Sequence, residues 1–516
     1  MFTETEGSRK TIGDVDVVYH DGLYHLFHLV LPNHDFIAHA VSKDGLDWER
    51  VNNAIFIGDP GSWDDLMLWT MAVSPDPWVS GRWRMFYTGL SRQEQGRVQR
   101  IGLAESDDLY HWRKAAVNWP RPSHPAGLAP NQNSPIDPAS SFPLEAEEPH
   151  YEASLEEGRH WTSFRDPYYW HHEGQGSLLA AGRVPYGPVV RRGCVSQFQE
   201  TSRGIFVSRP PLHHPGLYDD VEVPNLLEME GHFYLIGSIR EDAKIRYWHT
   251  ADLSQPWKSF HDNVLMAQGN YAGRVCRDDR GWLLWNFFTQ DVSDRTSQNV
   301  MPPPKRLTRS EDGLLRVTTF EAFETLIGDR IDARCLHPLK NGALDDTSFC
   351  SADGDRFELR SEAGFRAFVF EEMLECFRFR AHLQVVGKGK CGLVLRVNPE
   401  THDGYYLSLD MLKGVAQLRS WETGMAGSGE EMMQFRSLQS GFWHQTTPGE
   451  ADIQLIAMGS YLEFSINGNV ILSLADHTFV EGLTGLYLET AHLVLDQASL
   501  YRVHSVEQSE DYLVTG

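Results

Sequence analysis

The sequence predicts an all-β protein in two parts, a five-bladed β-propeller followed by a C-terminal β-sandwich. Three observations support this fold class. Short runs rich in Tyr, Phe, Trp, Val and Leu follow glycine-containing turns, and long helical periodicity is nearly absent. The unit of turn and strand recurs every 50 to 59 residues in the first part of the chain. Beyond about residue 330, regularly spaced alternating strands replace that repeat.

The propeller repeat is carried by turn glycines that each precede a strand. The five strands that follow such turns are LYHLFHL after Gly22, RWRMFYTG after Gly81, SLLAAGR after Gly176, HFYLIGS after Gly231 and WLLWNFF after Gly281. The steps from 22 to 81, from 176 to 231 and from 231 to 281 are 59, 55 and 50 residues. Each step matches the length of one four-stranded blade, so we expect five blades within residues 1–330.

A second repeated element supports the same register. The segments AVSKDGLDW, AESDDLYHW and HTADLSQPW end at Trp48, Trp112 and Trp257. We interpret each as a strand, an Asp-containing turn and a Trp that packs between blades. The wider step between the second and third units holds residues 115–160, which contain eight prolines. We expect an inserted, largely irregular loop there, and a lid, an oligomer contact and an inert loop are all open interpretations.

Residues 331–506 are predicted to form the β-sandwich. Strands such as FRFRAHLQV, CGLVLRV and GYYLSLDM alternate in polarity, and Asn467-Gly468 is a typical hairpin turn. The acidic tail, residues 507–516, is expected to fray. Bracing of the propeller is the default role for the sandwich, and glycan binding is the alternative.

Charge and cysteine content restrict the function classes. A formal charge of -25 and a pI near 5.3 argue against nucleic acid or an anionic membrane as a partner. The six cysteines are dispersed, with no CxxC pair. The first residues, MFTETEGSRK, contain no apolar signal segment, and no run of about 18 apolar residues occurs. We therefore expect a cytoplasmic protein that binds a neutral ligand; a homo-oligomer is left open.

Three carboxylates occupy matching positions in three of the predicted blades. Asp14 lies eight residues before Gly22, Asp166 eight before Gly174, and Glu222 nine before Gly231. These offsets predict that the three side chains lie on innermost strands, which converge on the propeller axis. Unpaired buried charges are costly and persist mainly where they act. Two carboxyl groups plus a third stabilising group are what glycoside hydrolysis requires, without a metal or another cofactor.

The segments around these carboxylates resemble glycoside hydrolase family 32, which comprises invertases, inulinases and levanases. GDVDVVYHDGLYHLFH is similar to the first blade of that family, SFRDPYYW to its RDP motif and DDVEVPNLLEMEGHFYLIGS to its WECPDLF motif. The resemblance covers roughly residues 8–328. It implies that Asp14 is the nucleophile, Asp166 the transition-state stabiliser and Glu222 the general acid/base of a retaining enzyme acting on fructofuranosides. A small-molecule or oligosaccharide substrate is thus the expected partner.

The first motif departs from the family pattern. TIGDVDV stands where the family has WMNDPNG, and Val223 replaces the cysteine of ECP. Asp16 shares the face of Asp14 and is an alternative nucleophile or a substrate-binding residue. The stretch DVDVV also looks like the start of family 43. Two alternatives therefore stay open, an inverting pentofuranosidase or xylosidase of the family 43 type and a non-catalytic carbohydrate-binding propeller.

Further candidates surround the three carboxylates. Arg165 is expected to pair with Asp166, to touch substrate, or to clamp two blades. Trp63 and Trp69 lie in a second-blade stretch that is read either as a sugar-stacking rim or as core. The adjacent histidine pairs do not indicate a metal, because neighbouring strand residues point to opposite faces.

Overall fold

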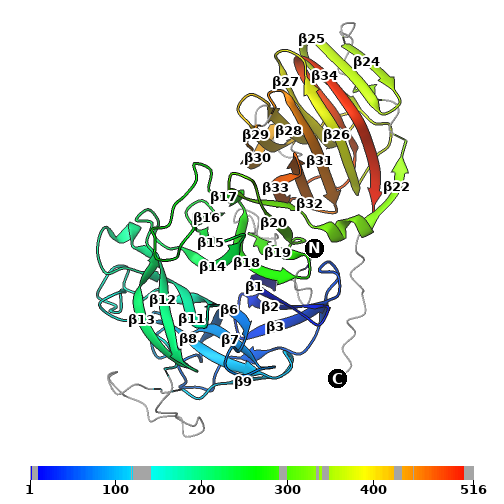
Figure 1. Ribbon diagram of the computed structural model, residues 1–516. Coiled ribbons are helices and arrows are strands. Elements are labelled where there is room, and N and C mark those ends of the chain that lie inside the picture. The colour runs from blue at the N-terminus through cyan, green and yellow to red at the C-terminus, as the bar shows by residue number, and fades with distance from the viewer. Residues whose placement is uncertain are drawn as a thin grey trace. The chain divides into compact units, whose positions relative to one another are not determined.

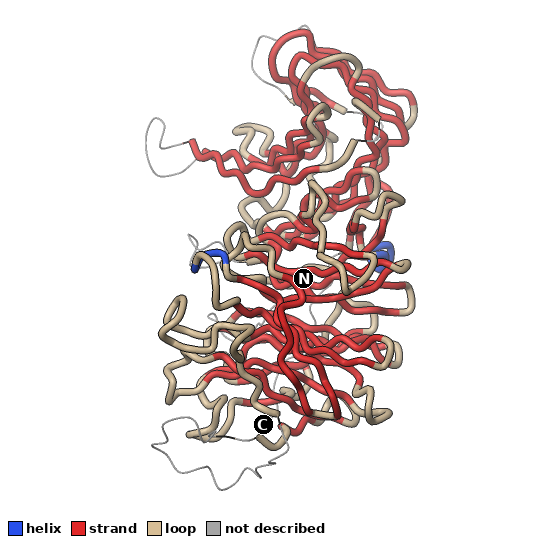
Figure 2. Tube along the Cα trace, turned by 60° about the vertical axis from the view of Figure 1, so that its left-hand side comes forward, coloured by secondary structure: helices blue, strands red, loops and turns tan. Residues whose placement is uncertain are grey.

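The computed structural model describes residues 2, 10–117, 119, 141–289, 299–332, 336–339, 348–423, 433–445 and 447–504. Regular structure among them is nearly all strand, as Figure 2 shows, with short 3-10 helices η1 (Val189–Arg191) and η2 (Glu321–Leu326). In this described part of the chain, no helix has the length and hydropathy required to cross a membrane. The prediction of an all-β fold is confirmed.

The chain forms two compact units. The first comprises Met1–Leu265 with Asn270–Leu315, and the second comprises Met266–Gly269 with Arg316–Gly516. The last segment of the first unit ends at Leu315, and Thr318 pairs with Asn469 within the second unit.

The first unit has the blade arrangement of a propeller. Figure 1 shows its groups of antiparallel strands following one another around the unit. The first strand of each group packs against the first strand of the next: β1 with β6, β6 with β10, β10 with β14, β14 with β18, and β18 with β1. The strands are β1 (Thr11–His20), β2 (Leu23–Leu31), β3 (Phe36–Ser42), β4 (Glu49–Arg50), β5 (Ile55–Phe56), β6 (Met67–Pro75), β7 (Trp83–Leu90), β8 (Gln99–Ser106), β9 (Trp112–Lys114), β10 (Arg165–His172), β11 (Gln175–Arg183), β12 (Gly193–Ser202), β13 (Ile205–His213), β14 (Glu222–Met229), β15 (His232–Ile239), β16 (Lys244–Thr250), β17 (Val264–Met266), β18 (Asn270–Asp278), β19 (Gly281–Phe288), β20 (Lys305–Arg309) and β21 (Leu315–Thr319).

Four blades are separate sheets among the described residues, not the five that the turn spacing predicts. They are β1–β5, β6–β9, β10–β13 and β14–β17. Strands β18, β19, β20 and β21 also neighbour one another in order, but the hydrogen-bonded path does not end at β21 and continues to β34. The glycine spacing reports where hairpins turn and cannot report where a sheet ends, which is why the blade count was wrong.

The repeated Asp-containing turns are held by side chains of the turn itself. The Ser42 hydroxyl accepts the N–H of Gly45, and Ser106 accepts the N–H of Leu109 in the same way. Such local bonds replace strand pairing and stop the strand. The Trp that follows reaches a neighbouring blade: the rings of Trp112 and Phe27 are 5.6 Å apart.

The inserted segment 115–160 is partly a core element. Residues 118 and 120–140 lie outside the described residues. The remainder has no extended strand, as expected, yet Phe142 and Tyr151 are fully buried against the apolar cluster around Phe86. The described part of this segment is therefore not a purely peripheral loop.

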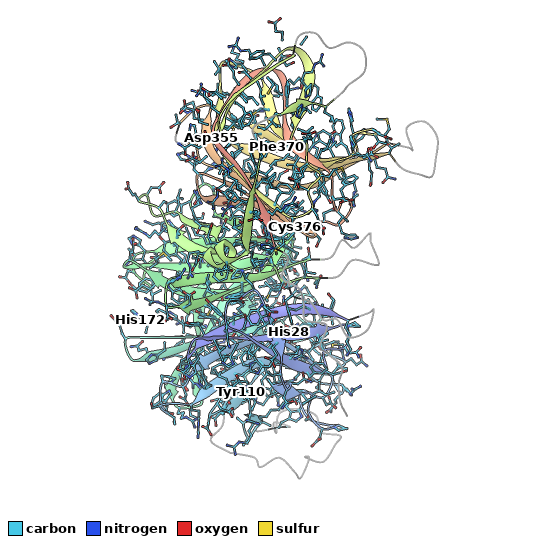
Figure 3. The ribbon with its side chains drawn as sticks, turned by 90° about the vertical axis from the view of Figure 1, so that its right-hand side faces the viewer. His28, Tyr110, His172, Asp355, Phe370 and Cys376 are labelled. Carbon is cyan, nitrogen blue, oxygen red and sulfur yellow. The ribbon has the colours of Figure 1, made fainter. Side chains whose placement is uncertain are left out.

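The second unit is a sheet domain with its own core. Figure 3 shows Phe370 among its strands, and the ring of Phe370 contacts those of Phe357 and Phe379. The long strand β34 pairs along its length with β22, β25, β26 and β27, so hydrogen bonding does not divide the domain into two separate sheets. Its strands are β22 (Ile327–Ile331), β23 (His337–Pro338), β24 (Ser348–Asp353), β25 (Arg356–Val369), β26 (Phe377–Val385), β27 (Lys390–Val397), β28 (Gly404–Asp410), β29 (Val415–Thr423), β30 (Met433–Phe442), β31 (Glu450–Met458), β32 (Tyr461–Ile466), β33 (Asn469–Ala475) and β34 (Leu483–Val503).

Candidate active site

A cavity of about 260 Å³ opens in the first unit where the innermost strands converge. It brings together Asp14 from β1, Asp166 from β10 and Glu222 from β14, residues that are far apart in the sequence. Arg165 and Trp69 also line it. The remaining lining residues are Gly13, Leu29, Leu31, His34, Thr70, Trp161, Arg240 and Phe287.

Bulges in the innermost strands aim these side chains into the cavity. The pairing register shifts between Ile12 and Val15 in β1, between Arg165 and Tyr168 in β10, and between Glu222 and Asn225 in β14. The same irregularity occurs in β6 beside Thr70 and in β18 after Tyr271. A bulge inserts an extra residue and turns nearby side chains out of the regular alternation. The five bulges therefore assemble the site at one end of the strands.

Glu222 is held between a cation and a phenol. Arg165 donates from Nη2 to Oε1 of Glu222 at 2.6 Å, and the Tyr271 hydroxyl donates to Oε2. Burial raises the pKa of Glu222, and the nearby carboxylates Asp166 and Asp220 raise it further, while Arg165 and Tyr271 oppose that rise. The balance is a raised pKa, so Glu222 holds its proton to higher pH than an ordinary glutamate.

Asp14 lines the same cavity as Glu222. Its Oδ2 accepts a hydrogen bond from the hydroxyl of Thr70 on β6. Burial raises the pKa of Asp14, as does the charge of Glu222, while Thr70, Arg274 and Arg165 oppose the rise. Because the two carboxyl groups repel when both are ionised, ionisation of one favours protonation of the other.

Asp166 is fixed by its backbone as well as by its carboxylate. Its φ of 61° is in the left-handed region, and its N–H donates to Oγ1 of Thr88 at 3.1 Å. Its Oδ2 accepts the N–H of Val223 at 3.1 Å and lies 3.6 Å from Nε of Arg165. Burial raises the pKa of Asp166 against the opposing charge of Arg165.

Arg165 pairs with acidic residues of its own blade and of the next one. Besides Glu222, it contacts Asp220 at 2.9 Å and donates to the hydroxyl of Ser163. Burial alone would raise the pKa of Asp220, but the guanidinium groups of Arg165 and Arg159 hold it below its usual range. An ionised Asp220 thus anchors Arg165 in the site, and Arg165 in turn positions Glu222.

Aromatic walls complete the cavity. Trp69 lies on β6 with its ring centroid 6.3 Å from that of His34, and both line the cavity. Trp161, which follows the inserted segment, also lines it, and the guanidinium of Arg159 stacks 3.8 Å from the ring centroid. Flat aromatic faces of this kind suit the apolar faces of sugar rings.

Two expected substrate contacts lie elsewhere. Trp63 is only 2% exposed, stacks on Tyr87 at 5.5 Å and packs over Gly102, so it is a core residue and not a sugar-stacking rim. Asp16 does not line the cavity either. Its Oδ2 accepts the N–H of Val73 at 2.6 Å, and its Oδ1 lies 3.9 Å from Nε of Arg274. The bulge at Asp14 separates the two aspartates, which a strict alternation would place together.

The residues missed from the sequence are Thr70, Trp161, Arg240 and Tyr271. A signal was available for one of them, because counting nine residues back from Gly281 reaches Ala272, directly after Tyr271. Thr70 and Arg240 have no such signal, since a single hydroxyl or guanidinium is common on any strand. Among the described residues, no group of three or more His, Cys, Asp or Glu side chains is arranged to hold a metal ion.

Comparisons with solved structures show what this fold is similar to. Sucrose-6-phosphate hydrolase from Lactobacillus gasseri superposes with a TM-score of 0.65 at 16% identity, over 96% of this chain and 91% of that one. Exo-inulinase from Aspergillus awamori gives 0.67 at 15% identity, over 96% of each chain. Fructan 1-exohydrolase IIa from Cichorium intybus gives 0.64 at 15% identity, over 96% of this chain and 95% of that one.

The class of the chain, a glycoside hydrolase, follows from a family model that matches part of the chain, together with this fold and the cluster of carboxylates. A search of curated proteins finds no match. The family model described as "Glycosyl hydrolases family 32 N-terminal domain" matches residues 14–142, beginning at Asp14. The resemblance to family 32 that the motifs indicate is thereby confirmed.

Proposed function

We propose that this protein hydrolyses β-fructofuranosides of the sucrose or fructan type. The observation that carries the proposal is the cavity in which a Glu222 of raised pKa faces Asp14 and Asp166. The match of residues 14–142 to the family 32 model supports a fructofuranoside as substrate. The names of the similar structures, a sucrose-6-phosphate hydrolase, an exo-inulinase and a fructan exohydrolase, agree with this substrate class.

The mechanism we propose is a retaining double displacement. Asp14 attacks the anomeric carbon while Glu222 protonates the leaving oxygen, and Glu222 then takes a proton from the water that releases the sugar. Repulsion between the two carboxyl groups supports this division of roles, because an ionised Asp14 keeps the proton on Glu222. Asp166 accepts hydrogen bonds from ring hydroxyls and favours the oxocarbenium-like transition state.

The proposal extends to the architecture of the two units. Strand β18 packs against both β14 and β1, and this packing closes the ring of innermost strands around the cavity. The sheet domain from β22 to β34 is proposed to be a β-sandwich.

The test compares leaving groups in the variant Glu222→Gln. We expect hydrolysis of sucrose and inulin to fall by about 10²- to 10⁴-fold, because these leaving groups need a proton donor. Activated aryl furanosides should be largely spared. Glu228→Gln, an exposed glutamate on the same strand, is the matched control and should retain activity on both classes.

Product stereochemistry, followed by NMR, checks the mechanism in the same assay. A retained anomeric configuration agrees with nucleophilic attack by Asp14, and inversion would favour a furanosidase of the family 43 type. An equal loss of activity on sucrose and on aryl furanosides in Glu222→Gln would show that Glu222 is not the general acid. No turnover of any furanoside by the parent protein would favour a binding propeller instead.

A further inference from the structure

Arg274 lies on β18 at the convergence of the innermost strands and is fully buried. It is not among the residues that line the cavity. Its guanidinium group donates hydrogen bonds to backbone carbonyls. Among the described residues, no hydrogen bond joins it to a carboxylate. Nη1 donates to the carbonyl of Pro224 at 3.1 Å, and Nη2 donates to those of Pro167 at 2.7 Å and Met71 at 3.1 Å.

Each of these carbonyls belongs to a bulge that carries a group of the site. Met71 follows Thr70, Pro167 follows Asp166, and Pro224 is two residues beyond Glu222. The planar fork of one guanidinium therefore ties together the bulges of β6, β10 and β14 from its own strand β18. A lysine could not do the same, because its ammonium has no planar fork of donors.

The remaining innermost strand supplies the counter-charge. Asp16 on β1 lies 3.9 Å from Nε of Arg274 and is itself held by the N–H of Val73 on β6. All five innermost strands thus meet at Arg274. An unpaired buried guanidinium would be costly, and the carbonyls together with Asp16 offset that cost.

We propose that Arg274 is a positioning residue for the hydrolysis, with Asp16 as its counter-charge. Arg274 fixes the bulges that set the geometry of Thr70, Asp166 and Glu222, and its charge acts on Asp14 through the protein interior. This inference rests on the proposed function, because it concerns the alignment of the same carboxyl groups. It also gives Asp16 a role other than substrate contact.

The charge effect separates this role from simple packing. The groups that act on Asp14 are Thr70 from β6, Arg165 and Asp166 from β10, Glu222 from β14, and Tyr271 and Arg274 from β18. The positive charge of Arg274 lowers the pKa of Asp14. Loss of that charge should raise the pKa of Asp14, whereas loss of the fork alone should disturb geometry but leave the charge in place.

Two substitutions test these effects separately. Arg274→Lys keeps the charge and removes the fork, so kcat on sucrose should fall by about 10²-fold with little change in KM, as small misalignments of reacting groups do. Arg274→Gln removes the charge as well, so the acidic limb of the pH profile of kcat/KM should move to higher pH. Arg84→Lys, at a buried arginine that pairs with Glu200 away from the cavity, is the matched control and should change stability only.

A second readout does not require turnover. The ¹³C signal of the Asp14 carboxyl group, assigned by its loss in Asp14→Asn, should titrate at higher pH in Arg274→Gln than in the parent. An Arg274→Lys variant with the parent kcat per folded molecule would overturn the proposal, and so would an unchanged Asp14 titration in Arg274→Gln. If Arg274→Gln does not fold, Arg274→Lys carries the test. A parent that hydrolyses no furanoside refutes the proposed function, while the carboxyl titration still decides the role of Arg274.

Discussion

Four carboxyl groups with raised pKa values lie at the innermost strands: Asp14, which is half-buried, and the buried Asp16, Asp166 and Glu222. Each makes the folded protein bind a proton more tightly than the unfolded chain does. Each therefore lowers the free energy of unfolding once it ionises. The site is thus a source of instability at neutral pH, which the surrounding apolar clusters must offset.

Asp16 gives the clearest expectation, since burial raises its pKa from 3.8 to about 7 against the opposing charge of Arg274. The favourable contribution is fully present below about pH 4, where the unfolded group is also protonated, and it is lost as pH rises through about 7. The Asp16→Asn variant should lack this dependence. Relative to that variant, the parent should lose on the order of 2 to 4 kcal/mol of stability between pH 4 and pH 8.

Urea unfolding across that pH range measures the difference. Asp47→Asn, at an exposed aspartate in the turn after β3, is the control and should give a curve parallel to that of the parent. Parallel curves for the parent and Asp16→Asn would contradict the prediction.

At the residue scale, the sequence could identify which carboxylates gather but not how each is buried. Asp14, Asp166 and Glu222 were predictable because three motifs place them at matched distances from turn glycines. The sequence also offers Trp63 and Asp16 as substrate-binding residues. The residue type alone does not show whether an aromatic ring or a carboxylate lies in the core or in the wall of a cavity. Only the packing over Gly102 and the contacts with Val73 and Arg274 separate them.

At the scale of elements, the decisive feature is the bulge shared by the innermost strands. Asp166 and Glu222 occupy different positions within this bulge, which is why Asp166 lies eight residues before its turn glycine and Glu222 lies nine residues before its own. Asp166 and Val223 both have positive φ, so the structural equivalent of Asp166 is Val223, and Glu222 corresponds to Arg165. A bulge has no characteristic turn residues in the sequence. Nor does a valine, such as Val223, indicate a backbone φ of 48°. The blades were therefore predictable, but the orientation of side chains within them was not.

Strand β18 contributes Tyr271, whose hydroxyl donates to Glu222 and opposes the rise of its pKa. In Tyr271→Phe, the pKa of Glu222 should rise further, since burial and the charges of Asp166 and Asp220 then act with only Arg165 against them. If Glu222 is the general acid, as we propose, it then stays protonated to higher pH, so the basic limb of the pH profile of kcat/KM should move to higher pH. A pH–rate profile measures this shift.

Tyr234→Phe is the matched control, because that buried hydroxyl bonds to the carbonyl of Gly313 away from the cavity. Its basic limb should coincide with that of the parent. A limb that stays fixed or moves to lower pH in Tyr271→Phe would show that the phenol does not stabilise the ionised form of Glu222.

At the scale of the whole molecule, two units with separate apolar clusters share one chain. The change from glycine-and-Trp repeats to alternating strands predicts both units, because each periodicity reflects how strands pack locally. The boundary and the course of the last sheet depend on pairing between distant segments. Thr318 with Asn469 is such a pair, and no local pattern encodes it.

The separate cores predict that the second unit can be weakened without loss of catalysis. Leu393 is fully buried in that unit, so Leu393→Ala should cost about 2 to 5 kcal/mol. Calorimetry should show a lower unfolding temperature, while kcat measured well below it stays at the parent value. Leu412→Ala, at a leucine that is 82% exposed in the same unit, should change neither. A fall in kcat for Leu393→Ala would mean that the sheet domain supports the site directly.

The closure of the ring by β18 against β1 also sets when the enzyme can first work during its synthesis. Asp14 leaves the ribosome early, whereas Tyr271 and Arg274 follow more than 250 residues later. Asn299, which donates to the carbonyl of Ile12 at 3.0 Å, follows later still. Contacts between such distant segments form late, because the conformational entropy lost in closing a long loop must be overcome before the contacts can stabilise the fold. We therefore expect a nascent chain to acquire turnover late, and fragments that end before β18 should contain Asp14 and Glu222 yet be inactive.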